Sequence, residues 1–243
     1  KLVRDKAYEI RGIEPPPLER PAPPKLLPIE KVSAISWQGS AGAQSYDVWR
    51  ASAAAGPWTK IATDVSDADV QYRPLYNDNS AVPGQQYWYR VVARNSAGDS
   101  DPSNLFGPVT VESRTLVDEC RDLSLVAAST GQVSPSSDNA RTVQEDCHRL
   151  TMPPGASIIY RVEKPISTFR VFVFGAEASN LATSISSDGK NFQRIKNDRA
   201  SFPSSQTVYG YATPIEFKGD ASQQDATYLK IEYEGSGGDA ATS

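Results

Sequence analysis

The strongest constraint on the fold is a repeated alternation of apolar and polar side chains, in short runs along residues 31–233. A period of two is that of a β-strand, whose successive side chains point to opposite faces of a sheet. Residues 34–37, 46–49 and 87–93 show the alternation clearly, and turn-forming pairs such as Pro83-Gly84 separate the runs. The sequence therefore predicts an all-β chain made of antiparallel sandwiches.

The size and charge of the chain limit its organisation and its partners. Its 243 residues suffice for two modest domains, and 25 basic against 29 acidic residues give a net charge of −4. This balance predicts no nucleic-acid partner, and the lack of any apolar run of about 18 residues predicts no membrane span. The single histidine, His148, argues against multi-histidine metal sites and against a Ser-His-Asp triad. We expect a monomer.

Both ends of the chain, and the segment that follows the first of them, differ from this pattern. Residues 1–12 have apolar side chains at helical spacing and then a glycine: Val3, Ala7, Ile10 and Gly12. We expect either the last helix of an upstream domain or a frayed chain end. Residues 13–29 contain seven prolines, which predict a semi-rigid polyproline-type linker and no core element. Residues 236–243 are expected to form a flexible tail.

Four separated motifs in residues 30–112 occur in an order that resembles a fibronectin type III domain. They are Ile35-Ser36-Trp37, Tyr46-Asp47-Val48, Pro83-Gly84-Gln85-Gln86-Tyr87 and Val91-Val92-Ala93-Arg94-Asn95-Ser96-Ala97-Gly98. The resemblance implies an immunoglobulin-like β-sandwich with Trp37 in its core. It also implies that Tyr87 is the corner tyrosine, whose hydroxyl ties a loop back to the sheet.

Two tryptophans of this domain, Trp49 and Trp88, have the opposite phase from the core positions. In a fibronectin type III domain their strands are neighbours, so both side chains are expected on the outer face of one sheet. Three interpretations of the two tryptophans remain open. They could be surface aromatics partly covered by loops or by the aliphatic part of Arg90, they could form an interface for a neighbouring domain, or they could form a platform for a sugar.

The second half, residues 113–235, also predicts strands, here over residues 157–162, 166–174, 181–187, 191–195, 207–212 and 227–233. Asp188-Gly189 predicts a tight hairpin turn. The motifs at residues 166–171, 184–192 and 226–232 resemble, in this order, the galactose-binding-like jelly roll of many carbohydrate-binding modules. These motifs belong to the scaffold, so the resemblance implies a fold and not a ligand.

Two cysteines and three acidic residues in this half suggest a disulfide bond and a structural metal site. Cys120 and Cys147 predict one disulfide in a secreted chain, with two reduced buried thiols as the alternative. Such a bond would stabilise the fold by roughly 3.5 kcal/mol in the loop-entropy model. Jelly rolls of the kind that this half resembles often hold a structural calcium, for which Asp118, Glu119 and Asp146 offer oxygen ligands. No other cofactor is expected.

The alternation in the second half predicts a candidate carbohydrate-binding face. If Phe169 faces the core, the opposite face carries aromatic and charged side chains, and a second aromatic pair follows in a later strand: Arg170, Phe172, Phe174, Tyr209 and Tyr211. The alternative is that the long segment of residues 124–145 covers the two phenylalanines. Loop sites near Asp138-Asn139, or around Arg199 and Phe202, are also open. Replacing Tyr209 and Tyr211 by alanine is expected to abolish glycan binding.

No hydrolytic motif or phosphate-binding loop is present, so we expect no enzymatic activity in this chain. The order of helix, linker, fibronectin type III domain and jelly roll resembles the C-terminal accessory region of a secreted bacterial glycoside hydrolase of the family 5 mannanase or cellulase type. This implies an extracellular location, a polysaccharide partner such as mannan, and a catalytic domain in the same polypeptide. A spacer or clamp without glycan contact and a cell-surface adhesion fragment are the alternatives. All four tryptophans precede residue 89, which argues against crystalline cellulose.

Overall fold

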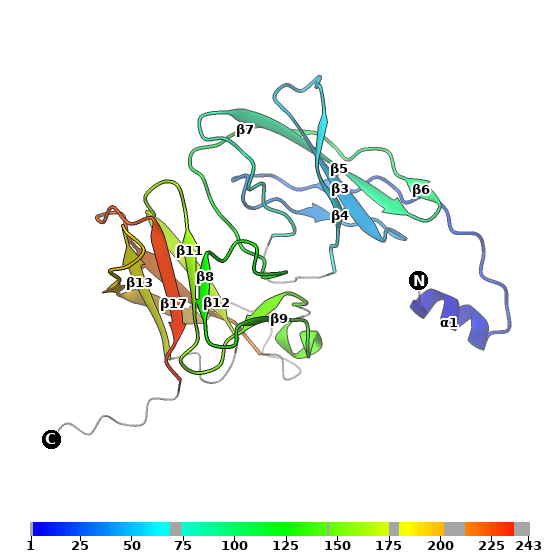
Figure 1. Cartoon of the computed structure of the whole chain (residues 1–243). Helices are drawn as coiled ribbons and strands as arrows, with labels where there is room; N and C mark the ends of the chain where they lie inside the picture. The colour runs from blue at the N-terminus through cyan, green and yellow to red at the C-terminus, as the bar shows by residue number, and fades with distance from the viewer. Residues whose placement is uncertain (1, 69–73, 145, 175–179, 202–211, 236–243) are drawn as a thin grey trace. The chain divides into compact units, whose positions relative to one another are not determined.

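The structure, a computed structural model, describes residues 2–68, 74–144, 146–174, 180–201 and 212–235. It divides the chain into two compact units, Lys1–Val117 and Asp118–Ser243, a few residues beyond the boundary expected after residue 112. Each unit is built of antiparallel sheets (Figure 1). The predicted all-β class is confirmed. Among the described residues, no helix has the length and apolar character needed to cross a membrane.

The N-terminal helix α1 spans Leu2–Ile10, within the segment expected to be helical. Two hydrogen bonds close its C-terminus: the Gly12 amide donates to the Glu9 carbonyl at 3.0 Å, and the Ile13 amide donates to the Tyr8 carbonyl at 3.1 Å. This pair of bonds is the glycine-based C-cap that satisfies carbonyls at a helix end. Ile10 and Ile13 are 77% and 55% exposed, so the described residues leave both side chains largely uncovered.

The first unit is a sandwich around one hydrophobic core. Its main sheet has the order β4-β3-β5-β6, and β7 also pairs with β5. These strands span Ser45–Ala51 (β3), Thr59–Val65 (β4), Gln86–Asn95 (β5), Gly98–Asp99 (β6) and Phe106–Thr110 (β7). On the other side of the core, β1 (Lys25–Leu26) pairs with β2 (Trp37–Gln38), and Ile35 forms a bridge to Tyr76. The arrangement is that of a fibronectin type III-like sandwich.

Alternate residues of the strands fill this core, as the period of two predicts. Trp37 is 4% exposed and its ring centroid lies 5.3 Å from that of Tyr46. Val48 and Val91 are fully buried and face each other in the register of β3 and β5. The predicted core position of Trp37 is therefore confirmed.

The prediction of a linker over residues 13–29 was wrong for its C-terminal half. Leu26 and Ile29 are 2% and 5% exposed and belong to the core, and the Leu26 amide donates to Asn104 Oδ1 at 2.8 Å. Pro21 and Pro24 are buried as well. A proline lacks only its own N–H, so prolines can flank a short edge strand such as β1. This segment is therefore the first part of the sandwich.

The second unit contains two larger antiparallel sheets and a small hairpin. The five-stranded sheet has the order β14-β13-β17-β11-β8, the three-stranded sheet has the order β12-β16-β15, and β9 pairs with β10. The strands span Ala128–Thr130 (β8), Ser134–Ser136 (β9), Arg149–Thr151 (β10), Ser157–Arg161 (β11), Thr168–Val173 (β12), Leu181–Ser186 (β13), Gln193–Ile195 (β14), Asn197–Ser201 (β15), Ile215–Asp220 (β16) and Tyr228–Tyr233 (β17). A short 3₁₀ helix, η1, spans Ala140–Val143.

The chain crosses between the two larger sheets several times, as in a jelly roll. Ile158, Ile185 and Leu229 from the five-stranded sheet are buried in the same cluster against which Phe169 and Val171 from β12 pack. The predicted strands at residues 157–162, 166–174, 181–187, 191–195 and 227–233 have counterparts. Most of the sixth, residues 207–211, lies outside the described residues, as does the expected tail at 236–243.

β13 and β14 form a hairpin around Asp188-Gly189 as expected, but its loop, residues 187–192, is longer than the tight turn that was predicted. The Asp188 carboxylate accepts from the amides of Lys190 and Asn191 at 2.8 Å and from the Asn191 side chain at 2.7 Å. These hydrogen bonds lower the pKa of Asp188 well below its usual range. The turn is therefore fixed by one carboxylate, which explains why its sequence signal is strong.

Each end of the connection between the units is bound within its own unit. Val117 exchanges two hydrogen bonds with the side-chain amide of Asn79, both at 3.1 Å. Asp118 accepts a hydrogen bond from the Tyr160 hydroxyl at 2.8 Å. The change from one unit to the next thus occurs between two consecutive anchored residues.

Candidate functional site

The register of the three-stranded sheet places the predicted glycan-binding residues of β12 on its outer face. Phe169 lies opposite Gly219 on β16, and its ring packs against the position that a Cβ of Gly219 would occupy, so this face is the core face. The side chains that alternate with these core residues form the outer face, which we call the charged face: Thr168, Arg170, Phe172, Asp198, Ala200, Glu216, Lys218 and Asp220. Alternation predicted this orientation for Arg170 and Phe172; their role in binding stays a prediction.

A buried carboxylate organises the charged face. The Glu216 side chain is only 9% exposed, yet it lies on the side away from the core. Arg170 Nη1 is 3.6 Å from Glu216 Oε1, and Lys218 Nζ is 3.2 Å from Glu216 Oε2. Phe172 lies directly opposite Glu216 in the register and is half-buried. The face therefore combines an aromatic ring, two cationic hydrogen-bond donors and three carboxylate acceptors, Asp198, Glu216 and Asp220.

The remaining predicted residues of this face have different outcomes. Phe174 follows directly after β12 and is half-buried, whereas Tyr209 and Tyr211 lie outside the described residues, as does Phe202. Glu216 and Lys218 were not predicted, because the strand that carries them was not expected. Their alternating sequence, Ile215-Glu216-Phe217-Lys218, was the signal that could have revealed it.

The long segment of residues 124–145 approaches the start of β16. The Ala212 amide donates to the Thr142 carbonyl at 2.7 Å, and Gln144 Nε2 donates to the Ala212 carbonyl at 3.3 Å. The helix η1 is thereby attached beside the three-stranded sheet. This contact supports part of the alternative in which the long segment covers the aromatic residues, although Arg170 and Lys218 remain 63% and 55% exposed.

In the first unit, Trp49 lies within a stack of cations and aromatic rings. Lys60 Nζ lies 5.2 Å from the centroid of the Trp49 ring, and the guanidinium of Arg90 lies 5.6 Å from it. Arg90 also lies 4.3 Å from the ring centroid of Trp58. Trp49 faces Arg90 and Lys60 directly across the sheet. These cation–π contacts favour the interpretation of Trp49 as a surface aromatic covered by its own domain.

The stack continues into a charge network that buries Asp47. Asp47 is 1% exposed and lies 2.5 Å from Lys60 Nζ and 3.4 Å from Arg94 Nη1. Trp88 instead packs against Gly107, where a Cβ would lie 2.7 Å from the indole ring. Both predicted interface residues therefore have partners within the domain, and their use as a docking interface or sugar platform stays a prediction.

The hydroxyl that ties a loop back to the sheet belongs to Tyr89, so the prediction of Tyr87 was wrong. Tyr89 is fully buried and donates to Asp78 Oδ2 at 2.9 Å. Asp78, 4% exposed, also forms an ion pair with Arg50 at 2.7 Å. The guanidinium of Arg50 lies 4.3 Å from the ring centroid of Tyr87, which is two residues earlier on the same face of β5.

The disulfide expected in the second unit is not formed in the structure. Cys120 and Cys147 are both described and half-buried, and no disulfide joins them. Asp118 and Asp146 instead accept hydrogen bonds from the amides of Cys120 and His148, at 2.7 and 2.9 Å. Within the described ranges, no three His, Cys, Asp or Glu side chains gather to hold a metal ion. The predicted disulfide is therefore not supported, and the calcium site at Asp118, Glu119 and Asp146 stays a prediction.

Two buried tyrosines, Tyr46 and Tyr89, and the half-buried Tyr160 are expected to resist ionisation at alkaline pH. Burial and the hydrogen bond to Asp67 raise the pKa of Tyr46 to about 12. Burial, followed by the charges of Asp78 and Asp118, raises the pKa of Tyr89 and Tyr160 further. Because an unfolded tyrosine ionises near pH 10, this contribution to stability is complete below about pH 10 and is lost as the pH rises through the folded values.

A spectrophotometric titration of the phenolate band tests this prediction. At about pH 11, at least three of the eleven tyrosines should remain protonated until the protein unfolds. Full ionisation of all eleven near pH 10, with folded-state circular dichroism retained, would show that these hydroxyls are not buried against carboxylates.

Comparisons with known proteins give limited matches. No family model matches the chain, and no curated protein does. Among solved structures, the twitchin kinase region from C. elegans matches over 41% of this chain and 18% of its own, with 27% identity and a TM-score of 0.31. A Fn3-like protein from Clostridium thermocellum matches over 40% of this chain and 94% of its own, with 22% identity and a TM-score of 0.27.

A third match is the α-L-rhamnosidase from Aspergillus terreus, over 87% of this chain and 26% of the enzyme, with 13% identity and a TM-score of 0.23. The chain thus spans a minor part of the rhamnosidase and of the twitchin region. Because these TM-scores are low, the description of the fold rests on the strand orders and cores given above.

Proposed function

We propose that this chain is the non-catalytic accessory region of a secreted polysaccharide-degrading enzyme, and that its second unit binds a β-glycan on the charged face. The observation that supports this most is the convergence of Arg170, Lys218 and Glu216 beside the half-buried ring of Phe172. A sugar ring needs an apolar surface for its C–H groups and donors and acceptors for its hydroxyls, and these side chains supply all of them.

The proposed mechanism is an increase in effective concentration. A weak module that holds the enzyme near an insoluble polysaccharide raises the local concentration of substrate without a strong single contact. The first unit would act as the spacer between the glycan-binding unit and the catalytic domain. A rigid spacer needs side chains that are fixed by contacts within the unit. The Arg50–Asp78 ion pair and the stacking of Arg90 on Trp58 are contacts of this kind.

Affinity electrophoresis of the whole chain in gels containing mannan, xylan or a soluble cellulose tests the proposal. We expect retardation by at least one of these polymers. Phe172→Ala should lower that affinity about tenfold, or ~1.4 kcal/mol. Circular dichroism and a melting curve establish that the variant is folded.

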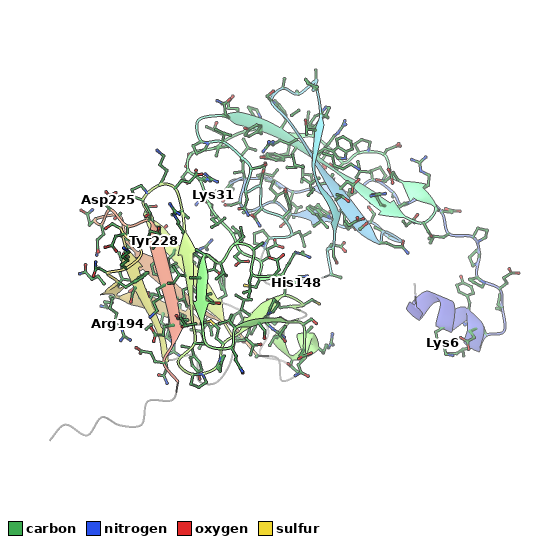
Figure 2. All side chains as sticks on the ribbon, viewed as in Figure 1. Lys6, Lys31, His148, Arg194, Asp225 and Tyr228 are labelled. Atoms are coloured by element: carbon green, nitrogen blue, oxygen red, sulfur yellow. The ribbon has the colours of Figure 1, made fainter. Side chains whose placement is uncertain are left out.

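Arg194→Ala is the matched control for surface charge. Arg194, labelled in Figure 2, comes from β14 of the other sheet, is 65% exposed and forms an ion pair with Glu234 at 2.7 Å. This control should bind as the unchanged chain does. Lack of retardation by all three polymers, or unchanged retardation of folded Phe172→Ala, would contradict the proposal.

A purely structural role as a spacer or clamp on a catalytic barrel is the second candidate. The coverage of Trp49 by Lys60 and Arg90 favours it, because side chains held inside a domain are not presented to a ligand. Under this candidate, deleting the region from the full-length enzyme lowers the thermal stability of the barrel and leaves retention on polysaccharide unchanged.

A further inference from the structure

The side-chain amide of Asn79 holds the last residue of the first unit. Asn79 Oδ1 accepts a hydrogen bond from the Val117 amide, and Asn79 Nδ2 donates one to the Val117 carbonyl, both at 3.1 Å. A residue of a neighbouring strand makes the same pair of bonds, so this side chain takes the place of a pairing partner. The preceding residue, Asp78, accepts from Arg50 and Tyr89, so the loop that carries the amide is itself fixed to the sheet.

The same arrangement occurs a second time in this unit. Asn104 Oδ1 accepts from the Leu26 amide at 2.8 Å, and Asn104 Nδ2 donates to the Leu26 carbonyl at 3.1 Å. There the side-chain amide holds the edge strand β1, whose Leu26 belongs to the core. Two asparagines thus fix separate backbone segments by the same pair of bonds, and Asn79 is the one that acts at the boundary with the second unit.

The residues between the sandwich and Val117 would form a linker without this contact. Residues 112–116 are all exposed, whereas Val111 is buried and its amide donates to the Gln85 carbonyl at 2.9 Å. If released, residues 112–117 would extend over about 20 Å. Because Val117 is held, these residues form a loop of the first unit that is closed at both ends.

The second unit begins at the next residue, which is anchored as well. Asp118 Oδ2 accepts from the Tyr160 hydroxyl at 2.8 Å, and Asp118 Oδ1 accepts from the Cys120 amide at 2.7 Å. Because a peptide bond is planar, the soft dihedrals between the two anchored residues are ψ of Val117 and φ of Asp118. We infer that Asn79 is a latch that confines the pivot between the two units to this one linkage, whether or not the chain binds a glycan.

NMR relaxation of the whole ¹⁵N-labelled chain tests the latch. In the unchanged chain, we expect order parameters of about 0.85 at Val117 and Asp118, the value of rigid backbone. In Asn79→Ala, the order parameters of residues 112–117 should fall below about 0.6. Hydrogen exchange of the Val117 amide should become roughly tenfold faster in the same variant, because the amide has lost its acceptor.

Asn104→Ala is the matched control, because it removes the same pair of hydrogen bonds from Leu26. It should leave the order of residues 112–118 as in the unchanged chain. Asn79→Asp is the second latch variant, since it keeps an acceptor for the Val117 amide and loses the donor to the Val117 carbonyl. Its loosening should lie between those of the unchanged chain and the alanine variant. Melting curves establish that each variant is folded.

Three outcomes would overturn the inference. An order parameter below about 0.6 at Val117 in the unchanged chain would mean that the contact does not hold this residue. Equal order of residues 112–117 in the unchanged chain and in both Asn79 variants would mean that other contacts fix the boundary. Loss of order at these residues in Asn104→Ala, to the extent seen in Asn79→Ala, would mean that a general loosening of the unit is the cause.

Discussion

Replacing Asp78 with alanine is expected to destabilise the first unit by about 3–5 kcal/mol, the range for breaking a buried ion pair. Arg50 and Tyr89 both donate to Asp78 Oδ2, at 2.7 and 2.9 Å, and Ser80 donates to Oδ1. Without the carboxylate, the buried Tyr89 hydroxyl loses its acceptor, and the mostly buried Arg50 guanidinium loses its counter-ion and keeps the neutral Ser80 hydroxyl at 3.0 Å. Asp78 lies in the loop that precedes β5, so its loss also removes the hydrogen bond from Tyr89 that holds this loop against the sheet.

Differential scanning calorimetry of the whole chain measures this effect, since the two units have separate cores. The transition of the first unit should fall by on the order of 15 °C, and that of the second unit should stay. Ser80→Ala is the matched control, because it removes one partner and leaves the ion pair, for about 0.5–1.5 kcal/mol. A first transition that moves no more in Asp78→Ala than in Ser80→Ala would show that the ion pair is not structural.

Replacing Gly107 with alanine is expected to cost about 2–5 kcal/mol, from backbone strain and overpacking together. Gly107 has a φ of +148°, and a Cβ there would lie 2.7 Å from the Trp88 ring and 2.8 Å from the Tyr87 carbonyl oxygen. The position lies at a register shift between β5 and β7, where the sheet already departs from regular pairing. Both distances are shorter than a Cβ tolerates, so the Trp88 ring or the backbone must shift.

Gly84→Ala is the control that separates the steric clash with Trp88 from the backbone strain of a positive φ. Gly84 has a φ of +82°, but no heavy atom lies within 4 Å of the Cβ position, so only about 1–2 kcal/mol of strain is expected. Urea unfolding of both variants gives the comparison, with Trp fluorescence as the probe of the first unit. Equal loss in the two variants would mean that Trp88 is not packed against Gly107.

The parts of the fold that depend only on local alternation could be predicted from the sequence. A strand places every second residue on one face, so Trp37 and Val48 were assigned to the core and Arg170 to the outer face. The turn at Asp188 was also predictable, because its hydrogen bonds come from residues two and three positions away.

Features that depend on distant residues could not be predicted in this way. Tyr87 and Tyr89 share one face of β5, and only the position of Asp78 in another loop decides which hydroxyl is used. Leu26 lies among prolines that signal a spacer, and its burial depends on pairing with β2. Glu216 was missed because Pro214 and Gly219 interrupt the pattern of its strand.

The central claim is that the outer face of the three-stranded sheet binds a glycan. A solution NMR titration of the ¹⁵N-labelled chain with β-1,4-mannan and β-1,4-xylan oligosaccharides tests it most directly. The account predicts that the largest amide shifts occur in Thr168–Val173 and Ile215–Asp220, with the Arg170 and Arg194 guanidinium signals as internal comparison: the first shifts and the second does not. Shifts confined to the first unit or to the five-stranded sheet, or no shifts with either sugar, would contradict it.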